Sequence, residues 1–218
     1  MSFITKEKSV ALYAALVSFG TYVFIFGFRK SFTVCTFEGM TFGPIAFKTA
    51  MVISQMLGYL MAKFYGIKFI SGLEKKNRYK IIFLLTGIAW TAWLLFAIVP
   101  APYSILFLFI NGFPLGMLWG VVFSYVEGRR STDFIGAALA VSFIFSAGWV
   151  KSVGAWLMQD FNVSETWVPF CTGLVFALPL VICVWGLEKV PAPSKEDEAL
   201  RAKRIPMTGE DRKLILKQ

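Results

Sequence analysis

The chain has 218 residues, of which 57% are hydrophobic and 16% are charged. A water-soluble domain of this size would carry about 25% charged residues, so the composition excludes that class. The sequence contains no histidine, which removes His-based nucleophile pairs, imidazole metal ligands and the common haem ligand. We therefore expect no enzyme activity and no cofactor. The three cysteines form no CxxC pair, and we expect them to be packing residues.

Six long stretches without charge follow one another along the chain. They are residues 9–28, 49–62, 81–99, 101–126, 134–150 and 166–187. A helix needs ~20 apolar residues to cross the ~30 Å hydrocarbon core of a bilayer. Five stretches reach or nearly reach that length, and the second does so when flanking residues join it. Since barrel strands are short and alternating, the pattern predicts an all-α membrane protein with six transmembrane helices.

Turns and prolines give the expected bounds of the six spans and of the tail that follows them. The spans are about 11 to 28 or beyond, 45–67, 81–99, 103–126, 134–158 and 167–187. We expect residues 1–190 to form the six-helix bundle and residues 191–218 a cytoplasmic tail. Ser194, followed by acidic residues, predicts the cap of a short helix. The tail is either a linker to a second membrane half or a plain solvated tail.

The distribution of basic residues predicts the orientation. With the N-terminus in the cytoplasm, six crossings leave 18 of the 22 Lys and Arg residues on the inner side. This asymmetry predicts a multi-pass protein of the cell membrane with both termini in the cytoplasm. The net charge of +9 then reflects topology and contact with anionic lipids, and no nucleic-acid partner is expected.

Glycines recur at every fourth position of the fourth predicted span. Gly112, Gly116 and Gly120 share one helix face, which lets a neighbouring backbone approach closely, and we expect them to pack helices. Pro114 lies among them and can bend the span. Asn111 precedes them and either ties helices together or contacts a substrate.

Arg29, at the end of the first uncharged stretch, is a candidate substrate residue with two placements. If the helix starts near residue 11 and ends soon after residue 28, Arg29 lies about 27 Å along it and reaches the outer interface. If the helix runs to about residue 37, Arg29 lies near mid-membrane, where an isolated Arg costs ~3 kcal/mol and needs an anionic partner or a wet cavity. An Arg fork suits phosphate or carboxylate.

Two lysines interrupt otherwise uncharged spans and are also candidate substrate residues. Lys63 lies more than four turns into the second span, where it either reaches toward the inner face or points into a cavity. Lys151 follows 17 uncharged residues of the fifth span. It is either an anchor at the outer interface or part of a substrate or ion pathway.

Local motifs in the first two spans resemble those of a known family. Tyr22 is followed by Arg29-Lys30 and Phe32, and the second span carries Tyr59, Lys63 and Phe64 before a basic loop. With six spans and both ends inside, this pattern resembles the N-terminal half of a major facilitator superfamily transporter, in its organophosphate:phosphate antiporter branch. The resemblance implies that Arg29 binds a substrate phosphate and that Lys63 is a second cation of the pathway.

The fourth span carries part of the same resemblance. Asn111-Gly112, Gly116 and Trp119 are similar to that branch's motif, whereas Leu115 and Gly120 depart from it. The arrangement of predicted helices resembles the family over the whole chain, whereas the sequence motifs that match cover about 30 residues.

These observations predict one half of a secondary active transporter that moves a small anionic solute, such as a phosphorylated one, by alternating access. Its partners would be the lipid bilayer, the solute and a second six-helix half, from a longer chain or from a second copy. The alternative is a membrane scaffold or assembly protein without transport. In that case Arg29, Lys63 and Lys151 would face lipid headgroups rather than a shared cavity.

Overall fold

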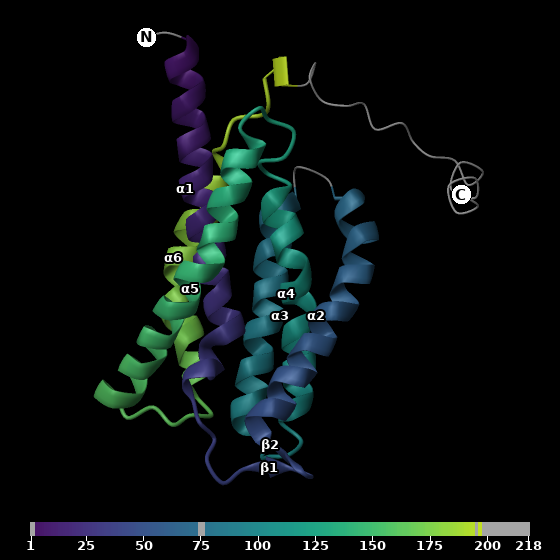
Figure 1. Ribbon diagram of the computed structural model, residues 1–218, viewed down its shortest axis with the longest axis vertical. Coiled ribbons are helices and arrows are strands. Elements are labelled where there is room, and N and C mark those ends of the chain that lie inside the picture. The colour runs from purple at the N-terminus through teal and green to yellow at the C-terminus, as the bar shows by residue number, and fades with distance from the viewer. Residues whose placement is uncertain (1–2, 74–76, 195, 198–218) are drawn as a thin grey trace, which may run out of the picture.

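The computed structural model describes residues 3–73, 77–194 and 196–197, which form a bundle of long helices (Figure 1). In chain order the elements are α1 (Phe3–Lys30), the 3-10 helix η1 (Ser31–Val34), β1 (Thr41–Phe42), β2 (Ile45–Ala46), α2 (Phe47–Ser71), α3 (Arg78–Ile98), α4 (Ile105–Phe123), α5 (Thr132–Asp160) and α6 (Val168–Glu188). The strands pair antiparallel as a small hairpin at one end of the bundle, which we call the hairpin end. The start of α1 and the end of the described chain lie at the opposite, terminal end.

Five of the helices in the described part of the chain are long and apolar enough to cross a membrane. They are α3, α4, α5, α6 and a segment formed by most of α1 with η1 (Glu7–Val34). The chain is thus an all-α, multi-pass membrane protein. The helix α2 is not among the five, although it has 25 residues. It carries Lys48, Gln55 and Lys63, which make it less apolar than its neighbours.

The helices occupy the positions that the sequence predicts, with one clear difference at the N-terminus. The helix α1 starts at Phe3, whereas we expected a start near residue 11. Its first turns contain charged residues and extend past the other helices at the terminal end (Figure 1). A charged turn of this kind can continue the helix outside the apolar layer, because helix formation there needs no apolar side chains.

Helix packing is closest between α2 and α4, and α1 packs against α5 and α6. The seam between α2 and α4 depends on glycine. A Cβ atom added to Gly112 would lie 2.2 Å from the Gln55 carbonyl oxygen, and one added to Gly116 would lie 2.6 Å from the Ala62 Cβ. From the other side, a Cβ on Gly58 would lie 2.2 Å from the Phe109 carbonyl oxygen. The two backbones approach closely because these side chains are absent.

Gly120, the third glycine of the row, allows a close contact further along the same seam. A Cβ added to Gly120 would lie 2.2 Å from the Ile70 Cδ1 atom. In the view of Figure 1, the last turns of α2 lean away from the rest of the bundle near the terminal end. The seam is tight toward the hairpin end and is filled there by backbone contacts, whereas near the terminal end it is closed by an isoleucine side chain.

Candidate functional site

The helix α1 ends inside the bundle rather than at the hairpin end. The Arg29 carbonyl oxygen accepts a hydrogen bond of 2.8 Å from Gln55 Nε2. Gln55 is eight residues into α2, so at about 1.5 Å per residue this contact lies about 12 Å from the start of that helix. After α1 the chain covers the remaining depth as η1 and irregular backbone, packed in an apolar cluster that includes Phe32, Cys35 and Trp93.

This geometry combines the two placements considered for Arg29. The helix stops at Lys30, so the longer helix to about residue 37 does not form. Arg29 nevertheless lies well inside the bundle, because η1 and the irregular segment after it carry the chain to the hairpin end. Non-helical backbone at membrane depth is tolerated where protein surrounds it, as it does here.

Side chains from three other helices satisfy the carbonyl groups at the end of α1. The Phe28 carbonyl oxygen accepts hydrogen bonds from Trp93 Nε1 and from Asn111 Nδ2. The Arg29 carbonyl oxygen accepts one from Gln55. A helix leaves its last carbonyl groups without intrahelical partners, and in a membrane no water replaces them. We call Phe28, Arg29, Gln55, Trp93 and Asn111 the α1-end junction.

Asn111 is fully committed to this junction. Its side chain is completely buried. Its Nδ2 atom donates to the Phe28 carbonyl and, at 2.9 Å, to the Ala89 carbonyl, while its Oδ1 atom accepts 2.8 Å from Gln55 Nε2. Of the two interpretations from the sequence, the contacts of Asn111 correspond to the one in which it ties helices together.

Arg29 and Lys63 both lie against the ring of Tyr59. The Arg29 guanidinium carbon lies 4.1 Å from the centroid of the Tyr59 ring, and the Lys63 Nζ atom lies 4.7 Å from the same centroid. Tyr22 also interacts electrostatically with Arg29. No ion pair joins either cation to a carboxylate within the described residues. Two cations held by aromatic faces, without an acid between them, can bind an anion.

The cations Lys63 and Lys151 are not brought together. Lys63 lines a cavity of about 810 Å³ near the terminal end, which we call the terminal-end cavity. Lys151 is exposed on α5, which packs against α1 and α6, and it does not line this cavity. Within the described part of the chain, no group of three Cys, Asp or Glu side chains could hold a metal ion.

The terminal-end cavity carries charges of both signs. Its charged lining residues are Lys63, Arg78, Glu127, Arg129 and Glu188. Sequence analysis singled out only Lys63 among these, because the others lie in loops or at helix ends, where charged residues are common. The cavity is therefore a feature that only the packing of α2, α4 and the segment after α6 creates.

Both carboxylates of the cavity already interact with neighbours. The Tyr125 hydroxyl donates a hydrogen bond to Glu188 Oε1, and Glu127 interacts electrostatically with Arg78. Burial and the bond to Glu188 raise the pKa of Tyr125 well above its usual range, so this hydroxyl keeps its proton as a donor. Arg78 lies 5.3 Å from the Tyr125 ring centroid and donates 2.6 Å from Nη1 to the Ser124 carbonyl.

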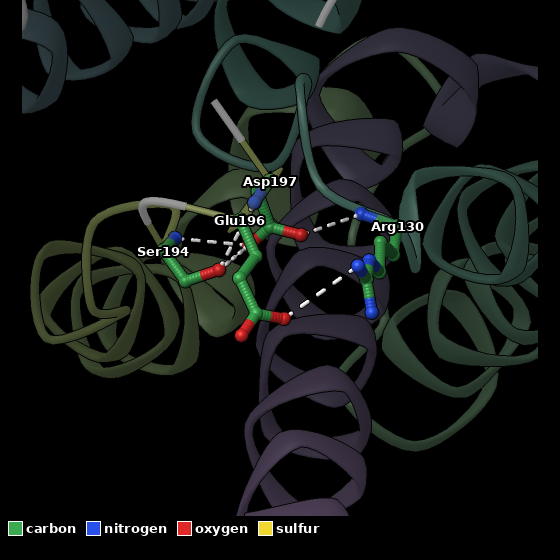
Figure 2. Close-up of polar contacts among 4 residues, drawn as sticks. All are labelled: Arg130, Ser194, Glu196 and Asp197. Carbon is green, nitrogen blue, oxygen red and sulfur yellow. Dashed lines mark hydrogen bonds and ion pairs between the residues drawn. The ribbon is translucent and has the colours of Figure 1, made fainter. Parts of the chain in front are cut away.

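The segment after α6 is fastened to the loop between α4 and α5 (Figure 2). The Arg130 amide donates 2.9 Å to Asp197 Oδ1, and Arg130 Nη2 lies 3.5 Å from Glu196 Oε2. Asp197 donates its amide to Ser194 Oγ at 3.1 Å and accepts from the Ser194 amide at 2.9 Å, a reciprocal capping box. We call Arg130, Ser194, Glu196 and Asp197 the tail clamp.

The clamp confirms the cap predicted at Ser194 and shapes the cavity. The hydrogen bond from the Arg130 amide lowers the pKa of Asp197, so the carboxylate stays ionised as an acceptor. Arg129 Nη2 donates to the Pro191 carbonyl, and residues 191–193 form part of the cavity wall. The rest of the predicted tail, from residue 198 onward, lies outside the described residues.

A group of polar contacts at the hairpin end was not predicted from the sequence. It is formed by Glu165 and Lys48 with the backbone of residues 33–37, and we call it the hairpin-end seal. The Glu165 carboxylate accepts hydrogen bonds from the amides of Thr36, at 2.6 Å, and Phe37, at 2.7 Å. Lys48 Nζ donates to the carbonyl oxygens of Thr33 and Cys35. Partial burial opposes ionisation of Glu165, but these amide bonds and the charge of Lys48 outweigh it and hold its pKa below the usual range. No pattern around an acid in a short loop predicts partners so far away in sequence.

Comparison with known protein families identifies the family of this chain. A family model described as a family of unknown function (DUF5690) matches residues 31–218. The chain belongs to this family. No curated protein and no solved structure matches it. In this DUF5690 chain the match begins directly after α1, so Arg29 precedes the matched residues, whereas Lys63, Asn111 and the tail clamp lie within them.

Proposed function

We propose that this DUF5690 chain is one six-helix half of a secondary transporter of the major facilitator type, and that it moves a small anionic solute across the cell membrane. In this proposal α2 is the sixth membrane span, in addition to the five apolar helices. Six crossings place both termini on one side, and the excess of Lys and Arg assigns that side to the cytoplasm. The start of α1 and the end of the described chain at one end of the bundle support this topology (Figure 1).

The observation that carries the proposal is the pair of cations over Tyr59. Arg29 belongs to α1 and Lys63 to α2, and both lie against one ring about 18 Å from the start of α2. A charged side chain at that depth costs ~3 kcal/mol or more on insertion scales. Two such cations without an acid partner among the described residues are costly if their role is purely structural. An anion that binds beside Tyr59 accounts for both of them.

The terminal-end cavity reaches one cation of that pair. Lys63 lies against Tyr59 and also lines the cavity, whereas Arg29 and Tyr59 are not among its lining residues. Alternating access would then rock this bundle against a second half around the site. The second half would come from a longer chain or from a second copy. Lys63 and Lys151 are both exposed, but only Lys63 lies against Tyr59 and lines the cavity, so Lys151 is not part of the proposed site. Asn111 is left out because its hydrogen bonds are used in packing.

The test is uptake of radiolabelled anions by proteoliposomes. The longest natural form of the chain is reconstituted, and inorganic phosphate and a small phosphate ester are offered under an imposed gradient. We expect uptake by the wild type and a loss of at least tenfold in Arg29→Ala and Lys63→Gln, as for loss of a charge-assisted contact. Lys151→Gln removes the same charge from an exposed site on α5 and should leave uptake unchanged.

Two results would contradict the proposal in different ways. Wild-type uptake that persists in Arg29→Ala would remove Arg29 from the pathway. Absence of uptake for every anion tested would favour the alternative, a scaffold or assembly protein, in which the polar groups serve packing as Asn111 does.

A further inference from the structure

We infer that the terminal-end cavity is a binding site for a phosphate group carried by an amphiphilic anion, with the headgroup of an anionic phospholipid as the natural source. The site shares Lys63 with the proposed transport site, but its two arginines belong to it alone and the inference does not depend on transport. It rests on three observations: the cations that line the cavity, the wall that the tail clamp fixes, and the apolar surface next to it.

The first observation is that three cations from three elements line the cavity. Lys63 comes from α2, Arg78 from the start of α3 and Arg129 from the loop between α4 and α5. Arg78 and Arg129 donate to the carbonyls of Ser124 and Pro191, and the Nε atom of each has no hydrogen-bond partner among the described residues. A guanidinium has five N–H donors, so both retain donors for a further acceptor.

The two carboxylates that line the cavity do not cancel the positive charge of its three cations. Glu188 already accepts from the Tyr125 hydroxyl, and Glu127 interacts with Arg78. Three cations and two carboxylates leave the lining with an excess of positive charge. Arg forks bind phosphate oxygens in pairs, which favours a phosphate group over a compact halide ion.

The second observation is that the wall is fixed before a ligand arrives. Residues 191–193 line the cavity, and they are held from both sides, by Arg129 at Pro191 and by the tail clamp at Ser194 and Asp197 (Figure 2). A wall held in this way loses little conformational freedom on binding, which lowers the entropic cost of a ligand contact.

The third observation separates a lipid from a soluble anion. Ile67 and Ile70 of α2 line the cavity beside its cations. On the same helix, Phe64 and Ile67 are 73% and 75% exposed. No other described residue covers these side chains, so an acyl chain can lie along α2 while its headgroup enters the cavity. Basic pockets between helices at the membrane surface bind anionic headgroups by this combination.

Adjacent arginines provide a matched pair of variants. Arg129 lines the terminal-end cavity, whereas Arg130 does not. Arg130 holds the tail clamp through its backbone amide, which glutamine keeps, and the ion pair that the substitution removes is solvent-exposed and contributes little to stability. Arg129→Gln and Arg130→Gln remove the same charge one residue apart, so any effect of net charge alone is equal in both. Arg78→Gln tests the site from a second element. Lys63 is left unchanged because it also belongs to the proposed transport site.

Native mass spectrometry of the delipidated full chain then measures retained lipid. The protein in neutral detergent is offered phosphatidylglycerol or phosphatidylcholine, and thermal unfolding confirms that each variant is folded. We expect phosphatidylglycerol to be retained in preference to phosphatidylcholine. Retention should fall about tenfold in Arg129→Gln and in Arg78→Gln, and should stay at the wild-type level in Arg130→Gln.

A competition experiment with a water-soluble phosphate ester distinguishes a lipid headgroup from a free phosphate as the ligand. If sn-glycerol 3-phosphate displaces phosphatidylglycerol and raises the melting temperature of the wild type but not of Arg129→Gln, the cavity accepts the phosphate from solution as well. Equal retention of the two lipids, or equal loss in Arg129→Gln and Arg130→Gln, would overturn the inference. These measurements need no gradient and no second half, so they stand apart from the uptake test.

Discussion

The α1-end junction and the terminal-end cavity are both polar regions of an apolar bundle, but they are built in opposite ways. In the junction, Asn111 and Gln55 use their amide groups on backbone carbonyls and on each other. In the cavity, Arg78 and Arg129 each keep buried donor atoms without partners among the described residues. A polar side chain within a membrane bundle is thus a candidate ligand only when its hydrogen bonds are not already used by packing.

The glycine seam beside the junction should show the largest effect. Gly112→Ala places a Cβ atom 2.2 Å from the Gln55 carbonyl, so α2 must move away from α4 and the junction opens. We expect a loss of about 3 kcal/mol in the free energy of unfolding. Gly87→Ala is the matched control in α3, because a Cβ there meets nothing within 4 Å.

Thermal unfolding in detergent measures both substitutions. Gly87→Ala should be neutral or slightly stabilising, since Ala favours helix over Gly. If the two variants unfold at the same temperature, the close approach of α2 and α4 does not stabilise the bundle.

The junction itself should show the next largest effect. Asn111→Leu removes three hydrogen bonds, and the carbonyls of Phe28 and Ala89 each lose one donor, although Phe28 keeps Trp93 Nε1. At about 0.6 kcal/mol for each bond in a membrane bundle, the expected loss is about 2 kcal/mol. Gln159→Leu, at an exposed amide of α5, is the control. An unfolding curve for Asn111→Leu that overlays the wild type would show that the tie is dispensable.

The ring shared by the two cations should contribute less to stability than the junction does. Tyr59→Leu removes the aromatic face that holds Arg29 and Lys63, with an expected loss of about 1 kcal/mol. Tyr65→Leu is matched on the same helix, where Tyr65 stacks on Phe69 and contacts neither Arg29 nor Lys63. Uptake assays on both variants sharpen the comparison: only Tyr59→Leu should weaken transport, and equal uptake would separate the ring from the pathway.

The smallest effect is expected at the hairpin end and depends on pH. The pKa of Glu165 is lowered in the folded chain, so its contribution to stability is present above the unfolded value of about 4.3 and is lost as the pH falls through the folded value. Glu165→Gln should therefore have a lower melting temperature than the wild type at pH 7, and this difference in melting temperature should become smaller below pH ~4. A difference in melting temperature that stays constant with pH would mean that the charge of Glu165 does not stabilise its contacts with Thr36 and Phe37.

Several local features could be predicted from the sequence because the bilayer imposes them on each segment separately. The apolar runs gave the positions of the helices, and α2 recruited flanking residues to reach 25 residues, as its short uncharged core required. The cap at Ser194 followed from a hydroxyl three residues before an acid. Each of these depends on residues within a few turns of one another.

The remaining features depend on which segments packing brings together. The early end of α1 requires Gln55, Trp93 and Asn111 to supply donors from other helices, and no local pattern around Lys30 specifies that stop. The convergence of Arg29 and Lys63 on one ring is likewise set by the register between α1 and α2.

The sequence by itself determined a helical membrane protein, the approximate bounds of its helices and the row of glycines in α4, because hydrophobic length and helical period are local properties. Only the tertiary structure decided that Asn111 serves packing, that Arg130 holds the segment after α6, and that a cationic cavity opens beside α2. The physical reason is that each depends on whether a polar group finds a partner on another helix, and that partner is fixed by packing rather than by neighbours in the chain.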